Sequence, residues 1–172
     1  MTTFTLTNGA DTFPGLGQDN SADDVINGLA GTDLIHGGSG NDVINGGTEA
    51  DTLFGDAGDD VIDLGVLPVK DQANGGIGLD TVAIHYNGVN NLVTGNSVRV
   101  VAHFSIGVWT TSVDGTAGAT LANFERLQID TGDANDNLWG GSGDDQISAA
   151  GGNDILRGGD GNDRIADSWG WI

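Results

Sequence analysis

A nine-residue period runs through most of this chain, and it constrains the fold more than any other feature. In each of ten frames the sixth residue is Asp and the eighth is Ile, Leu or Val. Gly fills the first position in seven frames and the fourth position in seven. Five frames run without interruption over residues 19–63, one stands alone at 75–83, and four cover 131–166.

The two parts of a frame have different physical preferences. Six Gly-rich residues that end in Asp favour a turn, because Gly adopts backbone conformations that other residues avoid. The last three residues, with one apolar side chain between two others, are typical of a short strand. Two frames, or 18 residues, then close one coil of a solenoid whose stacked strands pair in parallel. We predict two sheets around a thin core that includes Ile26, Ile35, Ile44, Leu53 and Ile62. Helix is disfavoured, because no apolar stripe of helical period appears.

The period also suggests how the chain is organised. Residues 1–18 form an N-terminal strand and cap with the partial frame NGADTF, 19–63 form repeat block one, and 64–130 form a β-rich connecting segment around the lone frame 75–83. Residues 131–166 form block two, and 167–172 form a C-terminal cap that contains Trp169 and Trp171. We favour one continuous solenoid, and the alternative is two rolls joined by a β insert.

Within the connecting segment, two stretches favour strands of a different kind. Residues 98–108 place apolar side chains at alternate positions, which predicts one longer, half-buried strand. LANFERLQI at 121–129 predicts a strand pair that returns the chain to block two.

Charge and composition exclude several classes of protein. The chain of 172 residues carries 25 acidic and 5 basic side chains, a formal charge of −20, which disfavours binding to nucleic acid or anionic lipid. With no Cys it has no disulfide, thiolate nucleophile or iron–sulfur cluster, and no apolar run is long enough to span a membrane. The acids comprise 23 Asp but only Glu49 and Glu125, and Asp is the shorter side chain that suits tight metal-binding turns. A multivalent cation is the expected partner.

The frames resemble the GGxGxDxUx nonapeptide of the RTX, or hemolysin-type calcium-binding, repeat. The resemblance covers ten frames, and the stretch from GGIGLDTV to LANFERLQIDTGDANDNLWGG resembles the segment that connects RTX blocks. It implies an all-β fold, a parallel β-roll (a right-handed β-solenoid) with calcium in its turns. It also implies export by the type I secretion machinery of a Gram-negative bacterium, so that the protein is secreted or lies at the cell surface.

The residue types suit calcium on chemical grounds as well. Ca²⁺ takes 6–8 oxygen ligands from carboxylates and backbone carbonyls, and small residues let successive carbonyls face the ion. An ion between one turn and the turn 18 residues later would pair Asp24 with Asp42, Asp33 with Asp51, Asp42 with Asp60, Asp136 with Asp154, and Asp145 with Asp163. The predicted side-chain ligands are Asp24, Asp33, Asp42, Asp51, Asp60, Asp80, Asp136, Asp145, Asp154 and Asp163. The predicted carbonyl ligands are Gly28, Gly31, Gly37, Gly38, Gly40, Gly46, Gly47, Gly55, Gly58, Gly140, Gly141, Gly143, Gly152, Gly158, Gly159 and Gly161. About five ions or more are expected, and Glu49, which replaces Gly at a fourth position, either adds a ligand or weakens its site.

Without metal, several pairs of facing carboxylates would repel with an energy similar to the whole stability of a domain. We therefore expect the blocks to fold only when calcium binds. No catalytic motif stands out: the three His are far apart and neither HExxH nor GxSxG occurs, so no enzymatic activity is expected. The alternatives are a non-catalytic appendage of a secreted protease, lipase or polysaccharide-modifying enzyme, and an adhesin or lectin-like module that binds a glycan or cell surface. For Trp169 and Trp171 the choice lies between capping the last coil and stacking on carbohydrate.

Overall fold

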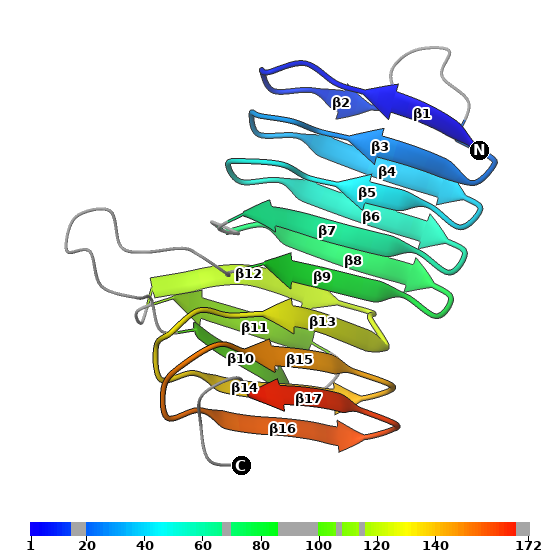
Figure 1. Cartoon of the computed structure of the whole chain (residues 1–172). Helices are drawn as coiled ribbons and strands as arrows, with labels where there is room; N and C mark the ends of the chain where they lie inside the picture. The colour runs from blue at the N-terminus through cyan, green and yellow to red at the C-terminus, as the bar shows by residue number, and fades with distance from the viewer. Residues whose placement is uncertain (15–19, 67–69, 86–99, 106–107, 114–115, 168–172) are drawn as a thin grey trace.

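The computed structural model describes residues 1–14, 20–66, 70–85, 100–105, 108–113 and 116–167. In this part of the chain every regular element is a strand, and no helix is present that could span a membrane. The strands form two sheets that face each other, and within the repeat blocks the chain passes from one sheet to the other at each turn (Figure 1). The molecule is therefore an all-β solenoid, as the nine-residue period predicts.

One sheet has eight strands, and every strand in it pairs in parallel. Its members in spatial order are β1 (Thr2–Thr5), β3 (Asp24–Asn27), β5 (Val43–Asn45), β7 (Val61–Val66), β9 (Thr81–His85), β13 (Arg126–Asp130), β15 (Gln146–Ala149) and β17 (Arg164–Asp167). Partners within block one lie 18 residues apart, as in the pairing of Val25 with Val43 and of Val43 with Val61. One coil is thus two frames long.

The other sheet has nine strands and contains the one departure from parallel pairing in the described residues. Its members in spatial order are β16 (Ile155–Asp160), β14 (Asn137–Ser142), β10 (Val100–Ser105), β11 (Val108–Val113), β12 (Thr116–Ala122), β8 (Gln72–Ile77), β6 (Thr52–Ala57), β4 (Leu34–Ser39) and β2 (Thr12–Phe13). Strands β10, β11 and β12 pair antiparallel and stand between β14 and β8, so the sheet is continuous across the connecting segment.

The prediction of a single strand over residues 98–108 is wrong. Ser105 at the end of β10 pairs with Val108 at the start of β11, so the chain reverses between them. Apolar residues alternate with others on both sides of this reversal, so the sequence pattern cannot reveal where the chain reverses. The strand pair expected at 121–129 is present as the end of β12 and as β13, which lie in different sheets.

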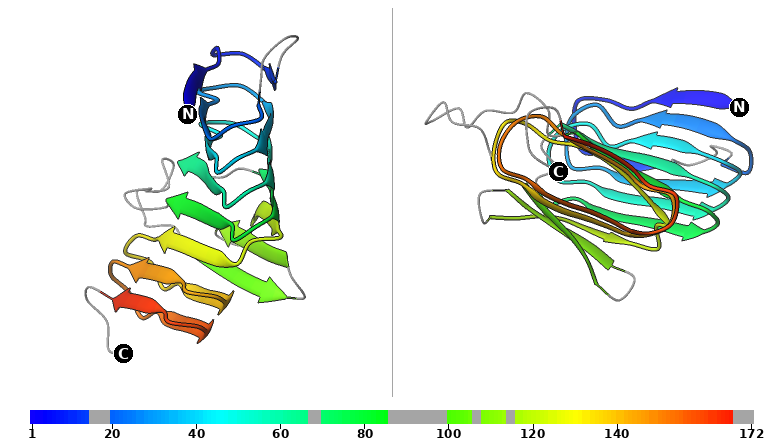
Figure 2. Two further views of the ribbon diagram at one scale, coloured as in Figure 1. Left: turned by 90° about the vertical axis from the view of Figure 1, so that its right-hand side faces the viewer. Right: turned by 60° about the horizontal axis from the view of Figure 1, so that its bottom comes forward.

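The core lies between the sheets and combines eighth-position side chains with inward-pointing residues two positions later, such as Leu64 and Ile84. Ile26, Ile35, Ile44, Leu53 and Ile62 are all 0% exposed, as predicted, because each short strand points one apolar residue inward. The core continues through Val82, Leu127, Leu138 and Ile147, and Phe13 lies at its N-terminal end with its ring centroid 4.7 Å from that of Phe4. Figure 2 shows each coil as a flattened ring.

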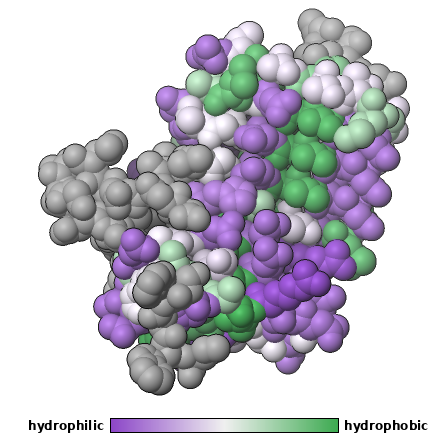
Figure 3. Space-filling model, in the orientation of Figure 1, coloured by the Kyte–Doolittle hydropathy of each residue, from purple (hydrophilic) through white to green (hydrophobic). Residues whose placement is uncertain are grey.

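The outer faces of the sheets are mixed in polarity. Val43 and Val61, at seventh positions of neighbouring coils, point outward and are 39% and 38% exposed. Figure 3 shows a hydrophobic stripe across the upper strands of the eight-stranded sheet, bordered by hydrophilic residues. The acidic turns lie at the two edges of the roll.

Candidate metal-binding turns

The turns form two columns, one along each edge of the roll. Edge A, at the left in Figure 1, holds the turns that lead into β2, β4, β6, β8, β14 and β16, whose last residues are Asp11, Asp33, Asp51, Asp71, Asp136 and Asp154. Edge B, at the right, holds the turns that lead into β3, β5, β7, β9, β15 and β17, whose last residues are Asp24, Asp42, Asp60, Asp80, Asp145 and Asp163. Every Asp predicted as a ligand therefore directly precedes a strand or is its first residue.

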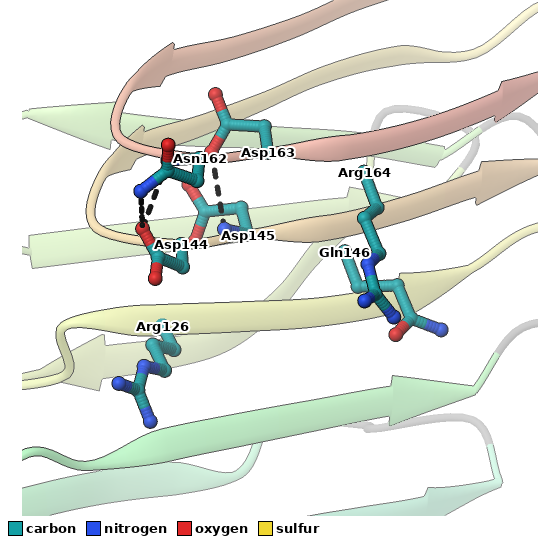
Figure 4. Close-up of a pocket in the computed structure, with 7 residues that line it drawn as sticks. All are labelled: Arg126, Asp144, Asp145, Gln146, Asn162, Asp163 and Arg164. Carbon is teal, nitrogen blue, oxygen red and sulfur yellow. Dashed lines mark hydrogen bonds between the residues drawn. The ribbon is translucent and has the colours of Figure 1, made fainter.

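A ladder of hydrogen bonds connects the Asp residues along each edge, and we call it the inner ladder. The backbone N–H of Asp24 donates to Oδ1 of Asp42 at 2.8 Å, and the N–H of Asp42 donates to Oδ1 of Asp60 at 2.8 Å. The same bond joins Asp33 to Asp51 at 2.9 Å, Asp136 to Asp154 at 2.9 Å and Asp145 to Asp163 at 3.1 Å. The structure thus brings together all five pairs that spacing alone predicts, and Figure 4 shows the last pair.

Oδ1 accepts the inner-ladder hydrogen bond, whereas Oδ2 of most of these residues has no hydrogen-bond partner in the described structure. Asp24, Asp33, Asp42, Asp51, Asp60, Asp80, Asp136 and Asp145 are at most 2% exposed. The Oδ2 atoms of Asp33, Asp42, Asp51, Asp60, Asp71, Asp80, Asp145 and Asp154 are buried with no hydrogen-bond partner among the described residues. A buried carboxylate oxygen without a partner is costly, so these positions need a cation or a proton.

Except in Asp71 and Asp154, this oxygen faces a small space that exists because the first residue of the frame is Gly. A Cβ built on Gly37 would lie 2.6 Å from Oδ2 of Asp42 and 2.8 Å from the carbonyl oxygen of Gly55, one coil later. The predicted ligands Gly28, Gly46, Gly55, Gly140 and Gly158 also have the Oδ2 of the Asp in their own frame close to such a Cβ. A carboxylate and a backbone carbonyl on opposite walls of a space are the donor set that Ca²⁺ prefers, so the residues fit calcium.

The other predicted Gly residues are required for a different reason. Gly40, at a fourth position, has a φ of +118°, a conformation that residues with a Cβ rarely adopt. Positive φ values are shared by Gly31, Gly38, Gly40, Gly47, Gly58, Gly141, Gly143, Gly152, Gly159 and Gly161. These residues shape the turns, while their role as carbonyl ligands stays a prediction.

Burial changes the acidity of the inner ladder. Desolvation raises the pKa of Asp51 to about 7 and the pKa values of Asp60, Asp71 and Asp145 to about 6. Burial also raises the pKa values of Asp33, Asp42, Asp80 and Asp154, and charges on neighbouring carboxylates add to each of these shifts. A bound divalent cation would reverse this effect, because it favours the ionised form.

Three acidic residues of these columns are missing from the sequence-based ligand set. Asp71 is 1% exposed and its Oδ1 accepts from the N–H of Asp51 at 2.9 Å, but it stands 20 residues after Asp51 instead of 18 and so falls outside the period. The segment Asp71–Asn74, which directly precedes the frame 75–83, still has Asp followed two residues later by apolar Ala73. Asp11, in the partial frame NGADTF, donates from its N–H to Oδ1 of Asp33 at 2.8 Å. The third, Glu125, accepts from the N–H of Asp80.

A second set of bonds, which we call the outer ladder, joins the fifth residues of successive turns. The N–H of Asn41 donates to Oδ1 of Asp23, and that of Asp59 donates to Oδ1 of Asn41, each at 2.9 Å. Leu79 donates in the same way to Asp59. In block two the N–H of Asn153 donates to Asn135 at 2.8 Å. The N–H of Asn162 donates to Asp144, also at 2.8 Å, and Figure 4 shows this bond. The frequency of Asp and Asn at the fifth position is the sequence signal for this ladder.

Other predicted features are placed as follows. Glu49 has a φ of +75°, and its Oε2 accepts from the N–H of Gly31 at 2.7 Å, so its carboxylate joins two turns of edge A.

Among the described residues no three acidic or His side chains gather as a metal cluster, so each candidate site has two carboxylates and depends on backbone carbonyls for its other ligands. Trp169 and Trp171 lie outside the described residues.

Comparison with known proteins agrees with this geometry. The family model of the RTX calcium-binding nonapeptide repeat matches residues 5–44, 36–66 and 130–165, which is more than half of the chain. No match was found among the curated proteins compared. The matched residues contain both columns of block one and nearly all of block two. The chain therefore belongs to the RTX calcium-binding nonapeptide repeat family, and its two-sheet solenoid is a β-roll.

Proposed function

We propose that the chain is a non-enzymatic module that binds several calcium ions in its stacked turns and folds when they bind. The observation that carries the proposal is the buried, partnerless Oδ2 atom that recurs along both edges and faces a space lined by a carbonyl of the next coil. The ligands would be the inner-ladder Asp residues and carbonyls of the turns. When bound, Ca²⁺ supplies positive charge, which neutralises the facing carboxylates.

The energies support folding that depends on calcium. Two carboxylates about 5 Å apart repel by roughly 3 kcal/mol at an effective dielectric constant near 20. Each ion that is present at ten times its Kd contributes about 1.4 kcal/mol of stability. The core between the two sheets is thin and buries few side chains per coil. The free energy of binding at several such sites would therefore decide whether the roll is folded.

Circular dichroism in excess EDTA and during titration with Ca²⁺ tests this part of the proposal. We expect little β signal in EDTA and a cooperative gain as calcium is added, with Mg²⁺ much less effective because it needs a smaller, octahedral site. Native mass spectrometry of the titrated protein should count about five ions or more. A full β signal in EDTA would contradict folding on calcium, and a metal-free mass in millimolar Ca²⁺ would contradict calcium binding itself.

We also propose that the module belongs to a secreted protein of a Gram-negative bacterium and passes through a type I secretion system before it folds. Calcium sites of extracellular modules typically have Kd values of about 10⁻⁴–10⁻³ M, so such sites stay empty in the cytosol. An unfolded chain also passes through a narrow channel more easily than a folded roll does. The test is expression with and without a type I transporter, and export that does not depend on the transporter would contradict this route.

A further inference from the structure

The two blocks meet in the eight-stranded sheet where β9 pairs with β13. Thr81 pairs with Arg126, although 45 residues separate them in the sequence. The turn before β13 consists of residues 123–125 and belongs to edge B (Figure 1). It lies between the turn 75–80 of the lone frame and the turn 140–145 of block two, since Gly143 packs against the carbonyl oxygen of Glu125.

The β9 side of this junction contains an inner-ladder carboxylate that has an oxygen without a hydrogen-bond partner. Asp80 is 0% exposed, and its Oδ2 has no hydrogen-bond partner in the described structure. This oxygen faces the space left by Gly75, where a Cβ would lie 2.6 Å from it. The opposite wall of that space is the carbonyl oxygen of Asn123. It takes the place that the carbonyl oxygen of Gly55 has next to Gly37 in the repeats.

The β13 side of the junction supplies a second carboxylate, which comes from outside the repeats. Oε2 of Glu125 accepts a hydrogen bond from the N–H of Asp80 at 2.8 Å. In the repeats this bond is made by Oδ1 of the Asp in the next turn, as between Asp60 and Asp80 at 2.9 Å. Glu125 therefore replaces that Asp, and its longer side chain reaches the inner ladder from a turn of three residues.

We infer that Asp80 and Glu125, with the carbonyl groups that line the space at Gly75, form a calcium site that joins the two blocks. The inference rests on the proposed calcium binding and extends it to Glu125 and Asn123, which no repeat frame contains. Its ion would lie between β9 and β13, so the contact between the blocks would itself depend on calcium. Loss of this ion should loosen the junction and leave the repeat sites of each block in place.

Glu125→Gln in the full chain tests the inference, because Gln keeps an oxygen acceptor for the N–H of Asp80 and removes the charge. The matched control is Glu49→Gln at the other Glu of the sequence, an exposed residue of edge A whose carboxylate accepts from Gly31 and Thr48. Native mass spectrometry across a Ca²⁺ titration counts the ions. We expect Glu125→Gln to hold one ion fewer than wild type, or to bind one ion at least tenfold more weakly, and Glu49→Gln to match wild type.

A second variant covers the case in which Glu125→Gln disturbs folding. Gly75→Ala places a methyl group in the space between Asp80 and Asn123 and leaves both carboxylates intact, so it should remove the same single ion. Hydrogen exchange at β9 and β13 should then be faster in both variants at intermediate Ca²⁺, with β3 and β5 unchanged. Unchanged ion counts in both variants would overturn the junction site. Glu125 would then act only as a hydrogen-bond acceptor for the N–H of Asp80. Wild type that binds no calcium would instead overturn the proposed function.

Discussion

In block one the two edges of the roll use the same inner ladder and differ in the outer one. On edge B the fifth positions are Asp23, Asn41 and Asp59, and their side chains accept backbone N–H groups of the following coil. On edge A the corresponding residues are Thr32, Ala50 and Lys70, which have no carboxylate or amide oxygen to offer. The described turns of edge B in block one are therefore joined by both ladders. On edge A the N–H of Gly31 donates to the fourth-position Glu49 instead, which joins one pair of turns, so the other steps of edge A depend more on the ion between them.

The largest difference should appear when calcium is removed and the pH is varied. Burial raises the pKa values of Asp51, Asp60, Asp71 and Asp145 in the folded state, so the folded chain holds more protons than the unfolded chain between about pH 4 and about pH 7. This stabilisation is complete below about pH 4 and is lost as the pH rises through about 6 to 7. In EDTA, we expect a stronger β signal at about pH 5 than at about pH 8.

The same titration can be followed at one site of each edge. The pKa is raised to about 7 for Asp51 of edge A and to about 6 for Asp60 of edge B, so both carboxyls should be protonated at about pH 5 and ionised at about pH 8. NMR of the carboxyl carbons in metal-free protein at low pH measures both. A β signal in EDTA that strengthens as the pH rises would contradict the predicted sign.

Asp60→Asn should have the next largest effect. Asp60 stacks between Asp42 and Asp80, so it belongs to two candidate sites. Asn keeps the inner-ladder acceptor and removes the charge, and the loss of two ions at ten times their Kd costs about 3 kcal/mol. Denaturant unfolding in saturating Ca²⁺ measures the change. The matched control is Asp59→Asn, which loses the same charge from the outer ladder and should shift stability by less than about 0.5 kcal/mol. Equal effects of the two variants would mean that general charge repulsion, and not the site, sets the stability.

Asn41→Ala should have a smaller effect and should be confined to edge B. It removes the acceptor of the Asp59 N–H, which is worth about 1 kcal/mol or less at an exposed position. The calcium midpoint should rise modestly, and Asn41→Asp, which restores an acceptor oxygen, should return it to the wild-type value. A midpoint that Asn41→Ala does not change would show that the outer ladder has no influence on the metal sites.

Thr32→Asn should have the smallest effect, in the opposite direction. It introduces an outer-ladder side chain on edge A, 18 residues before Ala50, and should stabilise the roll by about 0.5 kcal/mol. Thermal unfolding in EDTA at low pH is the sensitive measurement, because no ion masks the gain there. Thr32→Ser serves as the control, and a gain of equal size in it would assign the effect to something other than the amide side chain.

Most of the fold follows from the nine-residue period, because each frame encodes one turn and one strand. Asp42 and Ile44 show why: a buried carboxylate must end the turn, and an apolar residue must point inward two positions later. The period fails where the spacing changes. Asp71 is missed because it stands 20 residues after Asp51 instead of 18. Glu125 is missed because its turn is three residues long and uses a different acid. The reversal between Ser105 and Val108 depends on pairing with β12 and β14, which no local pattern contains.

The inner ladder runs in one direction only: the N–H belongs to the earlier coil and the carboxylate to the later one. The two ends of such a stack are therefore chemically unlike. If the chain is truncated at its C-terminal end, the last coil has inner-ladder N–H groups without acceptors. If it is truncated at its N-terminal end, the first coil has carboxylates without N–H donors. A β-roll of this kind has a polarity, like that of a helix, that decides which end can be extended by an acidic segment.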